Sequence, residues 1–232
     1  MFGSKLMISY TYNADFVICI DATYRMAPII ELVKRHAHQV CVSFIDRMEE
    51  TCRELSEFRV KIIVFREYGS EGEPMVETSF FTLPDEREEL ESFVCSIEAK
   101  GGSGGPANAL EAIALAIKSD WTAESTKKRH VILVYSNAAA LPLSERTGSP
   151  SYPEGIPADM NALNAWWEGE DPSFRGTYRS RAGRIIAIVP EETPWTEMLS
   201  WNRCFLVPIG NISPDQTLAD VEQIAIVAAC AY

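Results

Sequence analysis

The residues best suited to chemistry stand at the end of one apolar run. Residues 16–20 form a continuous apolar stretch, as in a strand that is buried on both faces, and Asp21 follows it directly. Thr23 comes two positions later, so a carboxylate and a hydroxyl leave the same strand end. Both groups are oxygen ligands that suit Mg²⁺ or Mn²⁺. In an open α/β sheet this end of a strand borders the crevice where ligands bind, so we expect a functional site above Asp21.

The strand that ends at Asp21 is one of several that alternate with helices along the chain. Short apolar runs predict strands at 16–20, 59–65, 76–83, 131–135, 184–189 and 204–209. Apolar residues at helical spacing predict helices near 28–55, 84–97, 110–117, 163–167, 195–201 and 215–231. The segment between the second and third strands is too short for a helical crossover, so these two strands should be antiparallel neighbours. The alternation elsewhere predicts an α/β fold with a mostly parallel, doubly wound sheet.

Length and composition fit a single domain that spans residues 1–232. The net charge of −12 argues against nucleic acid or an anionic membrane as partner, since both need a basic face. No apolar run approaches the roughly 20 residues of a membrane-spanning helix, and the N-terminus lacks the pattern of a signal peptide. The six cysteines include no CxxC pair, so a zinc site is not expected. We expect them to be reduced thiols, as in a cytoplasmic protein.

Two further regions are candidates for contact with a partner. Residues 138–157 form a long stretch rich in Pro, Ser and Gly, which predicts a binding loop or a mobile flap. Trp166 and Trp167 are adjacent on a predicted helix, so they cannot both face the same core, and we expect one to be exposed or to lie under this loop. A role in partner binding for one of them is the alternative to simple packing.

Four segments, in order along the chain, carry a resemblance to a known family. They read Asp21-Ala-Thr-Tyr-Arg-Met26, Phe65-Arg-Glu-Tyr68, Gly101-Gly-Ser-Gly-Gly-Pro-Ala107 and Ser136-Asn-Ala138. They resemble motifs of von Willebrand factor A (vWA) domains, and are most similar to a bacterial group of stand-alone vWA proteins. In that group the counterparts read Asp-Ala-Thr-Gly-Ser-Met, Phe-Arg-Asp-Tyr, Gly-Gly-Gly-Asp-x-Pro-Glu and Thr-Asp-Ala. The resemblance covers nearly the whole chain. It implies a six-stranded sheet in the order 3-2-1-4-5-6, with strand 3 antiparallel and helices on both faces.

The resemblance also implies a metal site that has lost most of its ligands. Domains of this family typically hold a divalent cation whose last coordination position is filled by a carboxylate of the partner. Asp21 and Thr23 match two of the ligands, but Arg25 replaces the second hydroxyl. The ligand of the glycine loop falls at Gly104, which has no side chain, and the strand-end aspartate becomes Asn137. Arginine stays protonated, and two positive centres about 4 Å apart repel by several kcal/mol, so we expect little or no metal.

Arg25 is then the residue that decides how the site works. The guanidinium can take the place of the cation, either by pairing with Asp21 to order the loop or by presenting its fork of donors to a partner's carboxylate. The alternative is that Arg25 points to solvent and the site has decayed, since exposed ion pairs contribute little.

The function that these features favour is non-catalytic protein–protein interaction, as an adaptor or sensor, at the crevice above Asp21 and without a cofactor. The partner is expected to be another protein. The first alternative is a Mg²⁺-dependent adhesion module that binds metal weakly through Asp21 and Thr23, with Ser103 or Ser136 supplying further oxygen. The second alternative is an enzyme of unknown type. The glycine loop lacks the Gly-Lys-Ser/Thr ending of a P-loop, and the chain has no Gly-x-Ser-x-Gly elbow.

Overall fold

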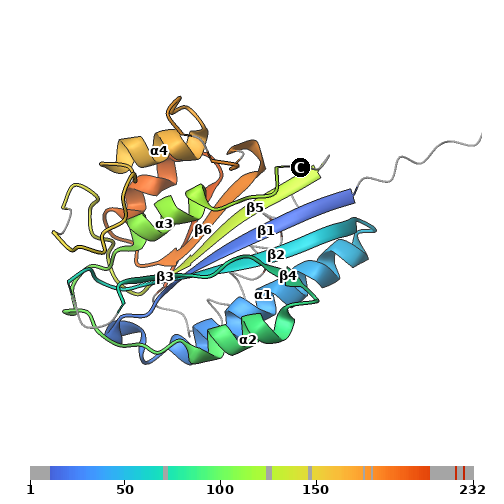
Figure 1. Ribbon diagram of the computed structural model, residues 1–232, viewed down its shortest axis with the longest axis horizontal. Coiled ribbons are helices and arrows are strands. Elements are labelled where there is room, and N and C mark those ends of the chain that lie inside the picture. The colour runs from blue at the N-terminus through green and yellow to red at the C-terminus, as the bar shows by residue number, and fades with distance from the viewer. Residues whose placement is uncertain are drawn as a thin grey trace, which may run out of the picture.

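The computed structural model describes residues 11–69, 73–123, 127–145, 148–174, 176–178 and 180–209, together with Gln223 and Val227. These residues form one sheet with helices packed on both of its faces (Figure 1). The predicted closing helix at 215–231 lies outside the described residues apart from those two.

The sheet has the strand order β3-β2-β1-β5-β6-β7, with β4 pairing β2 beside β3. Its strands are β1 (Thr11–Asp21), β2 (Glu54–Phe65), β3 (Met75–Glu77), β4 (Phe81–Leu83), β5 (Lys127–Tyr135), β6 (Gly183–Val189) and β7 (Cys204–Pro208). The strands β3 and β4 run antiparallel to β2, and all other pairs are parallel. The predicted fold class, strand order and antiparallel edge are therefore confirmed.

The sheet has seven strands, so the predicted number of six is wrong. The predicted third strand at 76–83 is divided into β3 and β4, and residues 78–80 between them stand opposite only residues 61–62 of β2. The hydroxyl of Thr78 accepts a hydrogen bond from the Ile62 N–H at 3.0 Å, and the Thr78 N–H donates to the Ile62 carbonyl at 3.0 Å. One extra residue is thus accommodated as a bulge in an edge strand, which interrupts the ladder.

Helices cover the two faces of the sheet in pairs (Figure 1). One face carries α1 (Ile30–Glu50) and α2 (Arg87–Ser96), and the other carries α3 (Ala109–Lys118) and α4 (Met160–Glu168). Three short 3₁₀ helices are η1 (Tyr24–Met26), η2 (Ser180–Ala182) and η3 (Trp195–Ser200). The prediction that the first long helix reaches residue 55 is wrong, because Cys52 adopts a left-handed φ of 52° that ends α1, and β2 begins at Glu54.

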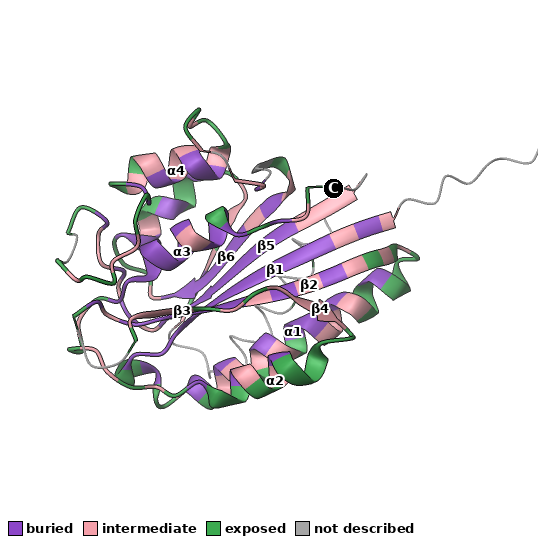
Figure 2. Ribbon diagram, viewed as in Figure 1, coloured by how far each residue is buried: buried purple, intermediate pink, exposed green. Residues whose placement is uncertain are grey.

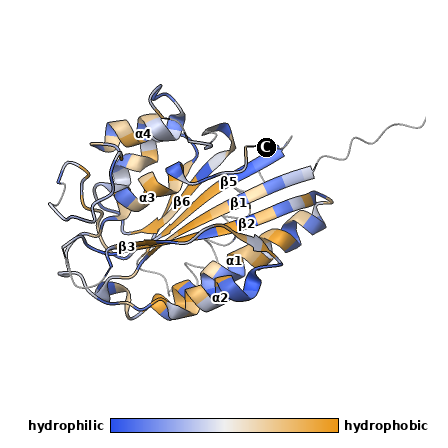
Figure 3. Cartoon of the chain, in the orientation of Figure 1, coloured by the Kyte–Doolittle hydropathy of each residue, from blue (hydrophilic) through white to orange (hydrophobic). Residues whose placement is uncertain are grey.

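The strand β1 lies between two apolar cores, one on each face of the sheet. Figures 2 and 3 show that the centres of the strands are buried and apolar. On the α1 face, the rings of Phe16, Phe44 and Phe58 pack with centroids 4.9, 5.0 and 5.1 Å apart. On the opposite face, Val17 and Cys19 pack in the core that contains α3. Because alternate residues of β1 point to alternate faces, a strand buried on both sides reads as a continuous apolar run.

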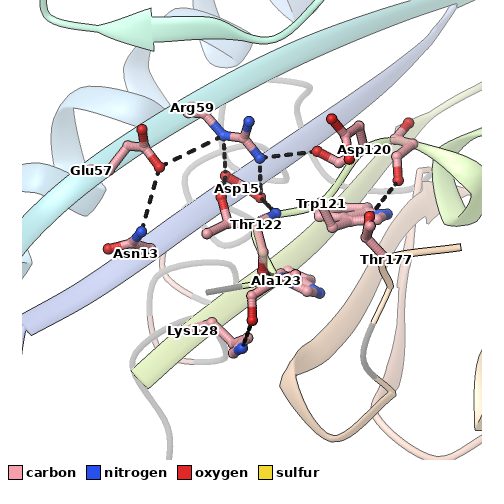
Figure 4. A network of polar contacts seen from close by, with 12 residues as sticks. Asn13, Asp15, Glu57, Arg59, Asp120, Trp121, Thr122, Ala123, Lys128 and Thr177 are labelled. Atoms are coloured by element: carbon pink, nitrogen blue, oxygen red, sulfur yellow. Dashed lines mark hydrogen bonds and ion pairs between the residues drawn. The ribbon is translucent and has the colours of Figure 1, made fainter. Parts of the chain in front are cut away.

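An ion pair between the buried Asp15 and the partly buried Arg59 joins the middle of β1 to the middle of β2 (Figure 4). Asp15 is 1% exposed and accepts hydrogen bonds from Nε and Nη2 of Arg59, both at 2.8 Å. The N–H and hydroxyl of Thr122 also donate to Asp15, and Arg59 Nη2 donates to the carbonyl of Asp120 at 3.0 Å. The pair therefore fixes the segment after α3 against both strands, on the amino-terminal side of Asp21.

Both tryptophans of α4 are buried, so neither is the exposed residue that was one of the two expected outcomes. Both belong to the core on the α3 face, so the expectation that they cannot share one core is wrong. Trp166 is 9% exposed and Trp167 is fully buried. Trp166 packs against Phe174 at 5.0 Å between ring centroids, and Trp167 stacks on Tyr178 at 5.2 Å. The chain that follows α4 folds back over it, so two faces of the helix are covered rather than one.

The five cysteines in the described part of the chain are free thiols. Cys19 and Cys41 are buried and Cys204 is partly buried, but Cys52 and Cys95 are exposed. The apolar sequence around Cys95 therefore does not bury this residue, because its side chain leaves the exposed side of α2. No helix among the described residues has the length and apolarity needed to cross a membrane.

Candidate functional site

The carboxyl ends of β1, β2 and β5 meet at one edge of the sheet, on the left of Figure 1. Four segments follow or approach this edge: η1, residues 66–68 after β2, the glycine loop at 101–105, and residues 136–137 after β5. Hydrogen bonds join them, among them the bond from the Tyr24 N–H to the Gly101 carbonyl at 2.9 Å. The four segments that carry the sequence resemblance therefore form one site.

Asp21 lies at the bottom of this site and is fully buried. One carboxylate oxygen accepts the Thr23 N–H at 2.8 Å, and the other accepts the Ser136 hydroxyl at 2.7 Å. Burial raises the pKa of Asp21 above its ordinary value, and the hydrogen bonds and the charge of Arg25 offset this only in part. Asp21 therefore acts mainly as an acceptor that fixes the loops after β1 and β5.

Thr23 is packed tightly against the glycine loop. A Cβ at Gly102 would lie 3.2 Å from both Cβ and Cγ2 of Thr23, and Gly102 has a φ of +88°. Glycine is therefore favoured at 102, because other residues are strained at this φ and a Cβ would have to displace Thr23 by a few tenths of an ångström. The Thr23 hydroxyl is buried and makes no hydrogen bond of regular geometry, although it is close enough to Asp21 to favour the ionised carboxylate.

Arg25 ties two other loops to η1. Its guanidinium Nη1 donates to the carbonyl oxygen of Gly104 at 2.8 Å, and its own carbonyl accepts the amide Nδ2 of Asn137 at 2.7 Å. No ion pair within 4.0 Å joins Arg25 to Asp21, both of which the structure describes. The hypothesis that Arg25 orders the loop by pairing with Asp21 is therefore wrong, because both carboxylate oxygens accept from Thr23 and Ser136 instead.

Glu67 is a carboxylate of this site that the sequence reasoning did not single out. Its oxygens accept the N–H of Ser103 at 2.5 Å and the hydroxyl of Ser103 at 2.9 Å. The signal for it was present, because Glu67 stands where the Phe-Arg-Asp-Tyr motif has its aspartate. The preceding Arg66 is 6% exposed and donates to the carbonyls of Glu73 and Glu98, so it holds the loops behind the site.

Tyr24 was also not singled out, although it is among the most exposed large side chains in the described residues. It is 67% exposed and stands next to Arg25, which is exposed as well. The backbone of η1 fixes both residues, since the Met26 N–H donates to the Thr23 carbonyl at 2.9 Å. The short helix η1 therefore carries an exposed aromatic ring and, at the next position, an exposed arginine.

The oxygen donors around Asp21 fit a divalent cation poorly. Gly104 contributes no side chain, and the amide nitrogen of Asn137 faces the Arg25 carbonyl. Two buried oxygens remain without hydrogen bonds, namely Thr23 Oγ1 and Asn137 Oδ1, and both are neutral. Among the described residues, no three His, Cys, Asp or Glu side chains are grouped to hold a metal. A hard dication prefers several anionic oxygens, whereas the carboxylates of this site, Asp21 and Glu67, already accept hydrogen bonds from Thr23, Ser136 and Ser103.

The long loop after β5 is anchored to its surroundings at several points. Ala140 forms an isolated bridge with Ala107, and the indole N–H of Trp195 donates to the Ala138 carbonyl at 3.0 Å. Further along, the hydroxyl of Tyr152 donates to the buried carboxylate of Glu111 at 2.8 Å. These contacts place the described part of the loop beside the site.

No protein-family model matches the sequence, and no curated protein does either. Solved structures do match. One is titled von Willebrand factor type A from Catenulispora acidiphila, with 11% identity and a TM-score of 0.55 over 94% of this chain and 43% of that one. The pilus adhesin SpaC from Lactobacillus rhamnosus GG matches in two crystal structures, with 11% and 10% identity and TM-scores of 0.58 and 0.55.

Each SpaC match covers 93% of this chain and 30% of the adhesin. This chain thus spans less than half the length of the structures it matches, and at these identities the likeness concerns the fold. The fold implied by the sequence resemblance is confirmed: the chain has the fold of von Willebrand factor type A domains.

Proposed function

We propose that this chain is a non-catalytic interaction module that binds another protein at the crevice above Asp21, largely without metal. The observation that carries the proposal is that Tyr24 and Arg25, consecutive residues of η1, are both exposed close to the fully buried carboxylate of Asp21. Tyrosine and arginine are among the residues most enriched at the energetic centres of protein interfaces. Their backbone is fixed before binding, which lowers the cost of ordering them.

In this proposal Arg25 supplies the positive charge that a cation supplies in related domains. One guanidinium nitrogen is held by the Gly104 carbonyl, and the other donors remain available to a carboxylate of the partner. A fork of two N–H groups matches a carboxylate in shape as well as charge. We expect the partner to place an acidic side chain against Arg25 and an apolar group against the ring of Tyr24.

An adaptor or sensor role, and a cytoplasmic location, belong to the same proposal. Domains with this fold commonly mediate contacts between proteins, which supports binding without identifying the partner. The free thiols among the described cysteines suit a reducing compartment. Burial raises the pKa of the Cys19 thiol well above its usual range, so this cysteine does not support a catalytic role.

A Mg²⁺-dependent module is the second candidate, and one observation favours it. Thr23 Oγ1 and Asn137 Oδ1 are buried in the site without hydrogen bonds, and such oxygens can be ligands. Binding through them would require Arg25 to move away and Asp21 to release one of its donors. We rank it second because that rearrangement gives up contacts that are already formed.

The test compares proteins retained from an extract of the source cells by three immobilised forms of the chain. These are the wild type, Arg25→Ser, and Arg47→Ser as a matched loss of an exposed arginine near the far end of α1. We expect a partner to be retained by the wild type and by Arg47→Ser, to be lost with Arg25→Ser, and to persist in chelator. Retention that is equal for all three forms contradicts the proposal, and retention that disappears in chelator favours the Mg²⁺-dependent module.

A further inference from the structure

A pocket of about 490 Å³ lies beside the candidate site. Its wall begins at Pro106, two residues after Gly104, and at Ala139, two residues after Asn137. The opposite wall is formed by the start of η3 and the first residues of α4. The pocket is therefore continuous with the loops that Arg25 holds, at the carboxyl ends of β5 and β6, where ligands of α/β folds bind.

The lining of the pocket combines apolar walls with two carboxylates. Pro142, Met160 and the nearly buried Leu143 are among its apolar lining residues. The charged side chains that line it are Asp159 and Glu197, both acidic and both exposed. An elongated side chain with an apolar stem and a positive end matches this combination, because the stem stays against carbon and the charge meets carboxylates.

The N-terminus of α4 also faces this pocket and by itself favours an anion. Asp159 is the N-cap of this nine-residue helix, and its Oδ1 accepts the Ala162 N–H at 2.9 Å. The helix end corresponds to about half a positive charge. The carboxylates of Asp159 and Glu197 carry about two negative charges, so the pocket favours a cation.

We propose that this pocket binds a lysine or arginine side chain of the protein partner. The partner would thus present an acidic side chain to Arg25 and a basic one to Asp159 and Glu197, which sets its orientation on the edge of the sheet. This inference rests on the proposed interaction function, because it assigns a second contact to the same partner.

The experiment uses capped tripeptides as probes of the full chain, followed by backbone amide NMR. Ac-Ala-Lys-Ala-NH₂ is compared with peptides that carry norleucine or glutamate in place of lysine. We expect the lysine peptide to shift the amide signals of Leu143 and Met160, with an affinity at least about tenfold above that of the norleucine peptide. Asp159→Asn combined with Glu197→Gln should abolish this preference, while asparagine keeps the N-cap of α4.

Three results overturn the inference: no shift at Leu143 or Met160, equal affinity for the norleucine peptide, or tighter binding of the glutamate peptide. A preference for lysine that survives in the double variant also overturns it. Titration of the Arg25→Ser variant with the lysine and norleucine peptides separates the two proposals. If this variant still prefers lysine but partner retention does not depend on Arg25, the pocket assignment stands and the proposed function fails. If partner retention depends on Arg25 but the chain shows no preference for the lysine peptide, only the pocket assignment fails.

Discussion

The guanidinium of Arg25 donates to the carbonyl oxygen of Gly104, 2.8 Å away, and leaves the carboxylate of Asp21 to two neutral donors. Asn137 completes the link by donating to the Arg25 carbonyl at 2.7 Å. Arg25 therefore connects the loops after β1 and β5 with the glycine loop by hydrogen bonds. In our proposal Arg25 takes over two roles of a cation: it links the loops, and it offers a positive charge to the partner. It does not act as the counter-ion of Asp21.

Replacing Arg25 by serine should change the response of the chain to divalent cations. We expect the wild type, after treatment with chelator, to show no heat of binding with Mg²⁺ or Mn²⁺ up to millimolar concentration. Arg25→Ser removes the fixed positive charge and adds a hydroxyl, so weak binding should appear, with an affinity at least about tenfold above that of the wild type. Calorimetric titration measures both, with Arg47→Ser as the control that removes an equal charge elsewhere. Micromolar binding by the wild type would show that our interpretation of Arg25 is wrong.

The buried carboxyl of Asp21 should make stability depend on pH. Its pKa is raised in the folded chain, mainly by burial, whereas an unfolded aspartate has a pKa of roughly 3.9. Below that value both states are protonated and the contribution of Asp21 is fully present. As the pH rises through the folded pKa, the unfolded state releases its proton first, so this contribution to the free energy of unfolding is lost.

Asp21→Asn removes this titration and keeps an oxygen for the Thr23 N–H. The free energy of unfolding of the wild type minus that of Asp21→Asn should therefore fall as the pH is raised from about 3.5 to 7. Urea unfolding at a series of pH values measures this difference. A difference that stays constant, or that rises with pH, contradicts the raised pKa.

The sequence predicted the architecture because each strand carries its own apolar signal. The run before Asp21 is apolar because β1 is buried on both faces, and such a pattern does not depend on distant contacts. The end of α1 was missed because apolar spacing continues past Glu50, while the left-handed backbone at Cys52 has no glycine to mark it. The bulge near Thr78 was missed because it arises from a side chain that bonds to the neighbouring strand.

The sequence indicated which residues gather at the candidate site, but not which hydrogen bonds they form there. The resemblance placed Asp21, Thr23, Arg25 and Asn137 together, and hydrogen bonds among their segments do join them. The partner of the Arg25 guanidinium is a backbone carbonyl of the glycine loop, and any residue carries such an acceptor. No side-chain pattern can therefore indicate it.

Two glycines of the same loop allow a matched test of packing against Thr23. Gly102 and Gly104 have φ values of +88° and +84°, so alanine strains the backbone at both positions by about 1–2 kcal/mol. A Cβ at 104 meets nothing within 4 Å, whereas one at 102 lies 3.2 Å from Thr23. Gly102→Ala should therefore lower the free energy of unfolding more than Gly104→Ala. Chemical denaturation compares them, and equal losses would mean that the loop moves freely away from Thr23.

The ion pair of Asp15 and Arg59 should matter for stability although it lies far from the candidate site. Replacing Arg59 by methionine leaves a carboxylate that is 1% exposed with only the donors of Thr122, and breaking such a buried pair costs about 3–5 kcal/mol. Asp15→Asn with Arg59→Met removes both charges, so it should be more stable than Arg59→Met alone. Urea unfolding of the two variants measures the difference. A double variant as unstable as the single one would mean that the lost packing of Arg59, and not the unpaired charge, sets the cost.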